Sequence, residues 1–202
     1  KVDTDGNPIY LPADEYLSGN VREKLQAAKA VAANDPQFQI NVAALEKVQP
    51  KDLEASEISV RLGATWIPAE YVQQFLEELL DAPYYTRRVV KVEFAAYTGS
   101  WAITNKKFGD GNIKATVTYG TNRANAYLIA ENALNLRSTQ IRDKVTAADG
   151  SVSWVLNKEA TQAAQEKQRQ ICEQFQDWIF KEPERRQRLV AIYNEKFNAL
   201  RP

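Results

Sequence analysis

Apolar residues recur every three or four positions in three stretches of the first 80 residues. This spacing gathers them on one face of a helix. We therefore predict amphipathic helices over residues 13–33, 37–48 and 68–80. Pro68 suits the first position of the third helix, because its fixed φ angle is helical and its missing N–H would have no partner there.

Between and after these helices the period changes to two, which is typical of strands with one buried face. The alternation of Ile58, Val60 and Leu62 predicts a strand within residues 56–67. Farther along, Asp-Gly pairs mark hairpin turns, since this dipeptide tolerates the positive φ angles that such turns need. The strands expected there lie at 90–94, 101–103, 113–119 and within 140–156, with turns at 108–112 and 149–150.

Helical spacing returns twice in the second half of the chain. A helix is expected after Thr121, its predicted N-cap, and extends to about residue 136. Residues 158–198 form two further amphipathic helices, separated at Glu182-Pro183 because proline cannot continue a helix. No repeat or linker divides the sequence. We therefore expect an α+β fold in a single domain over 1–202, with helices packed against antiparallel hairpins and two long helices at the end.

The composition is that of a globular domain, and it restricts the available chemistry. Hydrophobic residues make up 44% of the 202 residues, and no apolar run approaches the roughly 18 residues of a membrane span, so no membrane partner is expected. The chain has no histidine and a single cysteine, Cys172, which excludes Ser-His-Asp, Cys-His and His-ligated zinc sites. It begins at Lys1 and contains no methionine, which we interpret as a fragment of a larger polypeptide.

Several local patterns have a catalytic interpretation, but a structural one is favoured for each. Asn7-Pro8-Ile9-Tyr10 resembles the Asn-Pro-Pro-Tyr loop of amino-methyltransferases without its second proline, and is interpreted as a turn. Carboxylate pairs such as Glu77-Glu78 lie in charged surroundings and are interpreted as solvated faces. Cys172 follows apolar Ile171 on a helix and is interpreted as a buried structural thiol.

The net charge of zero hides an uneven distribution. Residues 1–84 carry 7 Lys and Arg against 14 Asp and Glu, whereas residues 85–202 carry 19 against 12. Two interpretations stay open: the halves neutralise each other, or the basic half presents a positive face to nucleic acid. Aromatic residues interleave with the first basic group, a composition that can follow phosphates and stack bases. The candidate nucleic-acid-binding residues are Arg87, Arg88, Lys91, Lys106, Lys107, Lys114, Arg185, Arg186 and Arg188.

Several motifs, taken together, resemble one family. They are Glu15-Tyr-Leu-Ser-Gly-Asn-Val-Arg-Glu-Lys-Leu25, Leu62-Gly-Ala-Thr-Trp-Ile-Pro68, Tyr119-Gly-Thr-Asn-Arg-Ala-Asn-Ala-Tyr127 with Ala133-Leu-Asn135, and, near the end, Ala163-Ala-Gln-Glu-Lys-Gln168, Phe175-Gln-Asp-Trp178, Pro183-Glu-Arg-Arg186 and Tyr193-Asn-Glu-Lys-Phe-Asn198. The sequence is similar to the central region of very large methyltransferase–helicase fusion proteins of bacterial plasmids, phages and integrative conjugative elements. In those proteins an N6-adenine methyltransferase domain comes first and a SNF2-type helicase domain comes later.

The resemblance implies a context rather than a reaction. It implies a cytoplasmic bacterial protein of a mobile genetic element, whose partners are DNA and the neighbouring methyltransferase and helicase domains of the same chain. For the parent it implies S-adenosylmethionine, ATP and Mg²⁺. The adenine loop and the Walker motifs of the family have no matching positions here, so the resemblance assigns no cofactor, metal or catalytic residue to this fragment.

Three functions follow as hypotheses. The first is a non-catalytic accessory domain that contacts DNA or couples the methyltransferase to the helicase. The second is a purely structural module that docks against neighbouring domains. The third and weakest is a metal-dependent, nuclease-like enzyme, since Asp and Glu can hold Mg²⁺ without histidine.

Overall fold

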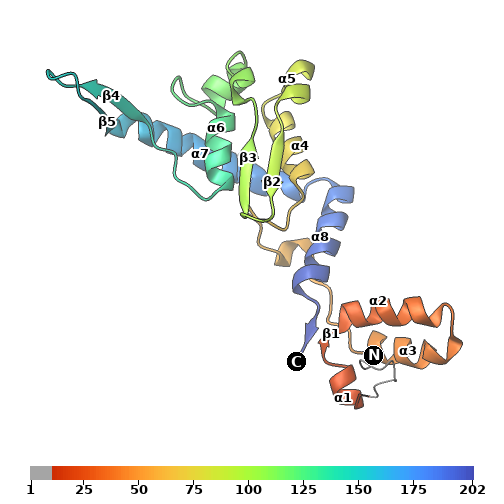
Figure 1. Cartoon of the computed structure of the whole chain (residues 1–202). Helices are drawn as coiled ribbons and strands as arrows, with labels where there is room; N and C mark the ends of the chain where they lie inside the picture. Colours follow the sequence, from red (N-terminus) through yellow and green to blue (C-terminus); the bar gives the residue numbers. More distant parts are fainter. Residues whose placement is uncertain (1–10) are drawn as a thin grey trace. The chain divides into compact units, whose positions relative to one another are not determined.

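Helices and short antiparallel hairpins make up the fold. The computed structural model describes residues 11–202, so the predicted turn at Asn7–Tyr10 lies outside the described residues. The predicted α+β class is confirmed. Contacts group the chain into two compact units (Figure 1): unit 1 contains the described residues up to Ile58 together with Gln187–Pro202, and unit 2 is Ser59–Arg186. The assignment of 1–202 to one domain stays a prediction.

Unit 1 combines the first helices with the returning end of the chain. Its hydrophobic core lies between two helices, with Val21 and Ala28 on one side and Val42 and Leu45 on the other. The elements are α1 (Ala13–Tyr16), β1 (Gly19–Asn20), α2 (Val21–Ala32), η1 (Pro36–Phe38), α3 (Gln39–Glu46), η2 (Ala55–Glu57), the part of α8 (Pro183–Phe197) from Gln187 onward, and β6 (Leu200–Arg201).

The helix predicted over 13–33 is interrupted near Gly19. This glycine has a φ angle of 71°, which L side chains rarely adopt, and it turns the chain between α1 and α2. Asn20 then starts α2, because its side-chain oxygen accepts a hydrogen bond from the N–H of Glu23 at 3.1 Å. The carboxylate of Glu23 accepts in return from the Asn20 amide, so two polar residues fix the helix start.

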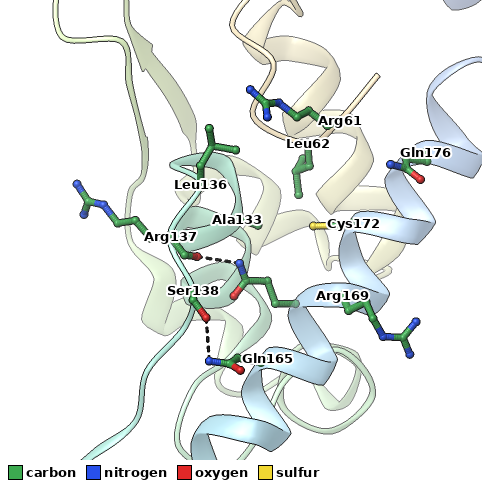
Figure 2. A pocket seen from close by; sticks show the side chains of 11 residues that line it. Arg61, Leu62, Ala133, Leu136, Arg137, Ser138, Gln165, Arg169, Cys172 and Gln176 are labelled. Atoms are coloured by element: carbon green, nitrogen blue, oxygen red, sulfur yellow. Dashed lines mark hydrogen bonds between the residues drawn. The ribbon is translucent and has the colours of Figure 1, made fainter. Parts of the chain in front are cut away.

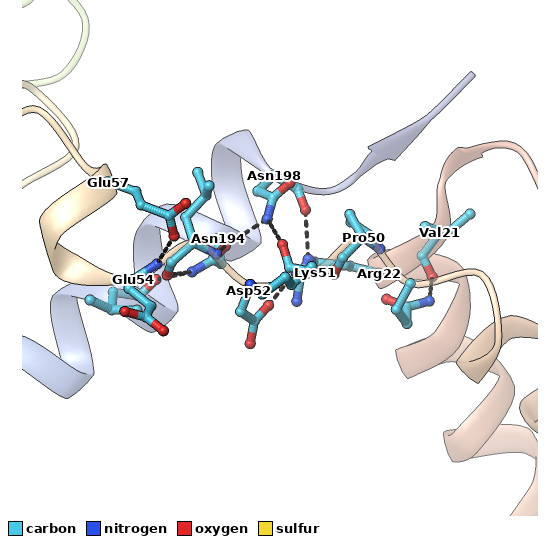
Figure 3. A network of polar contacts seen from close by, with 12 residues as sticks. Val21, Arg22, Pro50, Lys51, Asp52, Glu54, Glu57, Asn194 and Asn198 are labelled. Atoms are coloured by element: carbon cyan, nitrogen blue, oxygen red, sulfur yellow. Dashed lines mark hydrogen bonds and ion pairs between the residues drawn. The ribbon is translucent and has the colours of Figure 1, made fainter.

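Polar contacts join the returning chain to the start of unit 1 (Figure 3). Strand β6 pairs antiparallel with β1, with Arg201 opposite Gly19. The guanidinium of Arg22 on α2 donates to the carbonyl oxygen of Asn198 at 2.7 Å and forms an ion pair with Asp52. These bonds link three segments that are far apart in the sequence, so unit 1 is complete only when both ends of the described chain are in place.

Asn194 makes a second such link, and replacing it tests how much the link contributes. Its side chain is 2% exposed, accepts from the N–H of Leu53 at 2.9 Å and donates to the Leu53 carbonyl at 3.0 Å. We expect Asn194→Ala to lower the free energy of unfolding of unit 1 by about 2 kcal/mol, because Leu53 loses both partners. Hydrogen exchange of residues 45–58 measures this. The exposed neighbour change Glu195→Ala is the control, and equal effects of the two changes would contradict the proposed link.

Unit 2 packs α4 and α6 against one long helix, α7, and the β2–β3 hairpin against α4 and α6. Its core contains Phe75, Leu76, Ile129, Ile171 and Phe175, all nearly inaccessible to solvent. The elements are α4 (Ala69–Leu79), α5 (Tyr84–Val89), β2 (Val92–Ala95), β3 (Ser100–Ile103), η3 (Lys106–Gly109), the π-helical turn η4 (Lys114–Thr118), α6 (Ala126–Leu134), β4 (Arg142–Thr146), β5 (Val152–Leu156), α7 (Lys158–Ile179) and the first residues of α8.

Helix side chains cover both edges of the β2–β3 hairpin. On the β2 edge, Gln73 of α4 accepts from the N–H of Val92 at 2.7 Å. On the β3 edge, Asn135 accepts from the N–H of Trp101 at 2.9 Å and donates to its carbonyl oxygen at 2.8 Å, as a neighbouring strand would. The N–H of Ile103 donates to the Glu131 carboxylate in the same way. A two-stranded sheet is marginal alone, and these contacts supply hydrogen-bond partners at both of its edges.

The strand predicted within 56–67 is wrong. Ile58 and Leu62 are buried, whereas Ser59 and Arg61 between them are exposed, which explains the alternation, but the chain forms turns there and has no partner strand. Gly63 has a φ angle of 92°, and a Cβ placed on it would lie 2.3 Å from the carbonyl oxygen of Leu134. The burial of Ile58 and Leu62, rather than strand pairing, therefore produced the period of two, and within unit 2 the close approach of Gly63 fixes this segment against α6.

The return strand predicted at 113–119 is also wrong. The side-chain oxygen of Asn112 accepts from the N–H of Lys114 at 2.8 Å and starts a helical turn instead. The N–H of Tyr119 then donates to the Lys114 carbonyl at 2.8 Å, which closes the π-helical turn η4. The next helix starts at Asn125, not Thr121, because Asn125 accepts from the N–H of Leu128.

The hairpin turn predicted at 108–112 is wrong as well, because this segment ends η3 and leads into η4 instead of a return strand. The remaining predicted elements are confirmed. The helix at 68–80 appears as α4, the strands at 90–94 and 101–103 as β2 and β3, and the hairpin within 140–156 as β4 and β5. The chain breaks between α7 and α8 at Glu182-Pro183, as predicted. These elements share strong local signals, namely a long apolar stripe, a tight turn or a proline.

Candidate nucleic-acid interface

Basic side chains gather where α5 ends and where the chain leaves β3. Arg87 and Arg88 lie in the last turn of α5, and Lys91 follows it. The carbonyl oxygen of Lys91 accepts from the N–H of Thr104 at 2.9 Å, which holds the segment that carries Lys107 beside the end of α5. We call Arg87, Arg88, Lys91 and Lys107 the basic cluster, and all four residues are exposed.

Exposed aromatic rings accompany the basic cluster. Tyr84, Tyr85 and Phe108 are exposed, and the guanidinium carbon of Arg88 lies 5.7 Å from the centre of the Tyr84 ring. Over residues 84–118 the chain has six Lys and Arg but only two acidic residues. Cations beside exposed rings are the combination that binds phosphates and stacks bases.

Two predicted site residues nearby are already paired with carboxylates. Lys106 is half-buried, lies 2.7 Å from the Glu131 carboxylate and also donates to the carbonyl of Ile103. It therefore positions β3 against α6. Lys114 forms a longer pair with Asp81, at 3.8 Å, between exposed side chains. Such a surface pair is weak, so Lys114 stays accessible to an anion.

Arg185 is a structural residue, although the sequence analysis named it among the candidate nucleic-acid-binding residues. Its side chain is 5% exposed and its guanidinium carbon lies 3.5 Å from the centre of the Trp178 ring. It donates to the carbonyl oxygens of Ile179 at 2.9 Å and Trp178 at 2.7 Å, at the C-terminal end of α7. A cation is favoured there because it pairs with carbonyls that have no partner within the helix. The pKa of Arg185 is lowered, and burial of the guanidinium is the largest cause.

The residues next to Arg185 form the turn between α7 and α8. The carboxylate of Glu182 accepts from the N–H groups of Glu184 at 2.9 Å and Arg185 at 2.6 Å, and these bonds hold the pKa of Glu182 below its usual range. The negative charge of Glu182 thus offsets the unfavourable interaction between the basic residues at the start of α8 and the helix dipole. Arg186 is exposed, and its guanidinium lies 3.4 Å from the Phe180 carbonyl. Arg188 is also exposed and belongs to unit 1, whereas Arg186 belongs to unit 2.

A hollow of about 540 Å³ opens beside α7 (Figure 2). Gln165, Gln168 and Cys172 of α7 form one wall, and the segment that follows α6 forms another. The glutamines fasten this segment, since Gln165 donates to the Ser138 hydroxyl and Gln168 to the Arg137 carbonyl, both at 2.8 Å. The polar groups of the hollow are therefore used to connect α6 to α7.

Two further residues that line this hollow, Cys172 and Arg169, do not form a reactive site. Burial, and then Glu173, raises the pKa of Cys172, so it remains a thiol at neutral pH and is a poor nucleophile. Arg169 pairs with Glu166 and Glu173 on its own helix. Elsewhere in unit 2, burial raises the pKa of Tyr127 to about 12, which keeps its phenol protonated.

The comparisons with known proteins identify a family. A family model described as a domain of unknown function, DUF8437, matches residues 61–199, which is more than half of the chain. The chain belongs to the DUF8437 family. The match includes nearly all of unit 2 and continues through α8. No curated protein and no solved structure matches the sequence.

Two further properties of this DUF8437 chain concern metals and membranes. Over residues 11–202, no group of three or more Cys, Asp or Glu side chains is arranged to hold a metal ion. The helices within that range include none that combines the length and the apolar character of a membrane span. Glu77 and Glu78, a carboxylate pair in the sequence, accept instead from Gln73 at 2.6 Å and from the Trp178 indole at 2.6 Å.

Sequence reasoning missed a second cationic and aromatic surface in this DUF8437 chain. On the β4–β5 hairpin, Arg142 and Lys144 share a face with Trp154. The alternating apolar residues of β5 were visible in the sequence, but alternation normally indicates that one face is buried. Here Trp154 is 61% exposed. The signal that would have revealed it is the pairing of Lys144 with Trp154 across the Asp149-Gly150 turn.

Proposed function

We propose that this DUF8437 chain is a non-catalytic accessory domain that contacts DNA within a bacterial methyltransferase–helicase polypeptide. The basic cluster carries the proposal, because four exposed cations lie beside three exposed rings on adjoining segments. The resemblance of the motifs to the central region of methyltransferase–helicase fusions supports the cytoplasmic, DNA-processing context. Neighbouring methyltransferase and helicase domains are then its intramolecular partners, and S-adenosylmethionine, ATP and Mg²⁺ belong to those domains.

The expected interaction is electrostatic and independent of base sequence. Lys and Arg that neutralise phosphates release condensed counterions, so affinity falls steeply as salt rises. Lys91 and Lys107 offer compact ammonium charges, of which that of Lys91 also donates to the Arg87 carbonyl, whereas Arg88 offers a planar fork that fits a phosphate. Contacts of this kind fix position and orientation on DNA, which is the role an accessory domain needs.

A charge-reversal pair tests the proposal. We expect Arg88→Glu combined with Lys91→Glu to weaken duplex binding about tenfold or more near 50 mM salt, and to reduce the slope of log affinity against log salt by about 2. Fluorescence anisotropy of a labelled duplex measures both quantities. The matched control is Lys47→Glu combined with Lys51→Glu, which reverses two exposed charges in unit 1.

Two results would count against this function. If the unaltered chain binds no DNA near 50 mM salt, the DNA contact is wrong and a docking role within the polypeptide is the better proposal. If both charge-reversal pairs weaken binding equally, the interaction reflects overall charge rather than the basic cluster.

A further inference from the structure

One face of the β4–β5 hairpin combines cations with large apolar side chains. The register places Arg142 opposite Leu156, Lys144 opposite Trp154 and Thr146 opposite Val152. Residues directly opposite each other in an antiparallel pair lie on the same side of the sheet. These six residues therefore form a single surface, which we call the hairpin face: Arg142, Lys144, Thr146, Val152, Trp154 and Leu156.

The hairpin face is open to solvent. Trp154 is 61% exposed and Val152 is 50% exposed, although apolar side chains of this size are usually covered. Figure 1 shows the hairpin extending from the N-terminal end of α7, away from the β2–β3 hairpin of the same unit. The β2–β3 hairpin differs, because Trp101 and Ile103 on it are buried and helix side chains bond to its edges. An uncovered apolar strip on an extended arm indicates a binding surface.

The base of the hairpin is fixed, so the face is presented in a defined orientation. The N–H of Ile141 donates to the Thr161 hydroxyl of α7 at 2.9 Å, and Asn157 donates to the carbonyl of Ile141 at 2.9 Å. On the opposite face, the carboxylate of Asp143 accepts from Arg123 and from Asn157, both at 2.8 Å. The bond from Arg123 is the largest of the effects that lower the pKa of Asp143.

The charges of the hairpin face identify what it fits. The two charged residues on this face, Arg142 and Lys144, are both cations, while Asp143 points to the opposite face and is paired with Arg123. A protein partner that covered Trp154 would also have to neutralise both cations. A nucleic acid supplies a phosphate and a flat aromatic base together. In a duplex the base faces are covered by stacking, whereas in a single strand they are open to an indole ring.

We propose that the hairpin face binds single-stranded nucleic acid, with an unpaired base stacked on Trp154 and phosphates at Lys144 and Arg142. The proposal rests on the DNA contact proposed above and adds a second site of a different kind. The basic cluster holds phosphates of either form of DNA, and the hairpin face favours a strand whose bases are exposed. Such a face suits a protein that meets locally opened DNA.

A pair of oligonucleotides separates stacking from charge. The 202-residue chain is titrated with labelled oligothymidine of about 12 nucleotides and with an abasic strand of equal length, which has the same phosphates and no bases. We expect Trp154→Ala to weaken oligothymidine binding about tenfold and to leave abasic binding unchanged. Trp154→Phe should retain most of the affinity, because a phenyl ring also stacks. Lys144→Glu should weaken both.

A matched control lies one residue away. Val155 is 53% exposed on the opposite face of β5, so Val155→Ala should leave both affinities unchanged. Circular dichroism should show the same folded signal for each variant, since the altered side chains are exposed. The inference is overturned if Trp154→Ala binds oligothymidine as the unaltered chain does, which is also the result expected of a protein-docking face. It is overturned equally if abasic and thymidine strands bind with the same affinity.

Failure of this inference can be distinguished from failure of the proposed function. If neither duplex nor single strand binds, both are wrong. If duplex binding is present and is lost in the Arg88→Glu, Lys91→Glu pair, while Trp154→Ala has no effect on single strands, only the hairpin site is wrong.

Discussion

Replacing Arg185 with alanine is expected to lower the free energy of unfolding of unit 2 by about 3 kcal/mol. The change removes the stacking on Trp178, takes the side-chain donor from the Ile179 carbonyl oxygen, and leaves the Trp178 carbonyl oxygen with backbone N–H donors alone. Trp178 itself packs beside Phe75 and Phe175, with ring centres 5.5 Å and 6.4 Å away, so the loss extends into the core. Urea unfolding followed by tryptophan fluorescence measures the change, because all four tryptophans lie in unit 2.

Two companion variants make the Arg185 result specific. Arg186→Ala removes the same charge from the next residue, which is exposed, and should alter the free energy by no more than about 0.5 kcal/mol. Arg185→Lys keeps a cation but lacks the planar fork, so it should recover only part of the loss. Equal destabilisation by the two alanine variants would show that charge, and not the buried contacts, determines stability here.

Gly63→Ala is expected to destabilise unit 2 by about 3–5 kcal/mol. At a φ angle of 92° an L side chain is strained, and the added Cβ would meet the backbone of Leu134, with the carbonyl oxygen 2.3 Å away. Backbone cannot move aside as a flexible side chain does, so α6 must shift or the turn must open. Thermal unfolding followed by tryptophan fluorescence measures the loss.

Gly99 provides the control for this change. It also has a positive φ angle, 64°, but nothing lies within 4 Å of the Cβ that alanine would add. Gly99→Ala therefore carries only the conformational cost, about 1 kcal/mol. If Gly63→Ala and Gly99→Ala have equal effects, the close approach to α6 contributes nothing.

Local sequence signals were sufficient for much of the fold. The apolar stripe of α4 begins at a proline, and the β4–β5 hairpin turns at Asp149-Gly150. Both signals depend on residues a few positions apart, so the structures they favour do not depend on the tertiary fold. The strand predicted within 56–67 failed because Leu62 is buried by the tertiary fold and not by a neighbouring strand. Single-sequence periodicity cannot distinguish the two causes.

The candidate site was less predictable, since it depends on which cations stay exposed. Arg87, Arg88, Arg185 and Arg186 look alike in the sequence. Arg185 differs because it lies seven residues after Trp178, across a helix corner that brings the two side chains together. Lys106 differs because Glu131 approaches it from α6. Such pairings follow from tertiary structure, so composition indicated a basic region without separating structural cations from accessible ones.

The interrupted course of unit 1 has a consequence for biosynthesis. Strand β6 pairs with β1, which a ribosome makes about 180 residues earlier, so at 5–20 residues per second roughly 10–40 s separate the two partners. Unit 2 is continuous and its whole length emerges during that interval. We therefore expect vectorial folding, in which unit 2 becomes compact first. During this time α2 and α3 form only a partly stable helical pair. The returning segment Gln187–Pro202 then closes unit 1, with Asn194 and Asn198 donating hydrogen bonds to the carbonyl oxygens of Leu53 and Lys51.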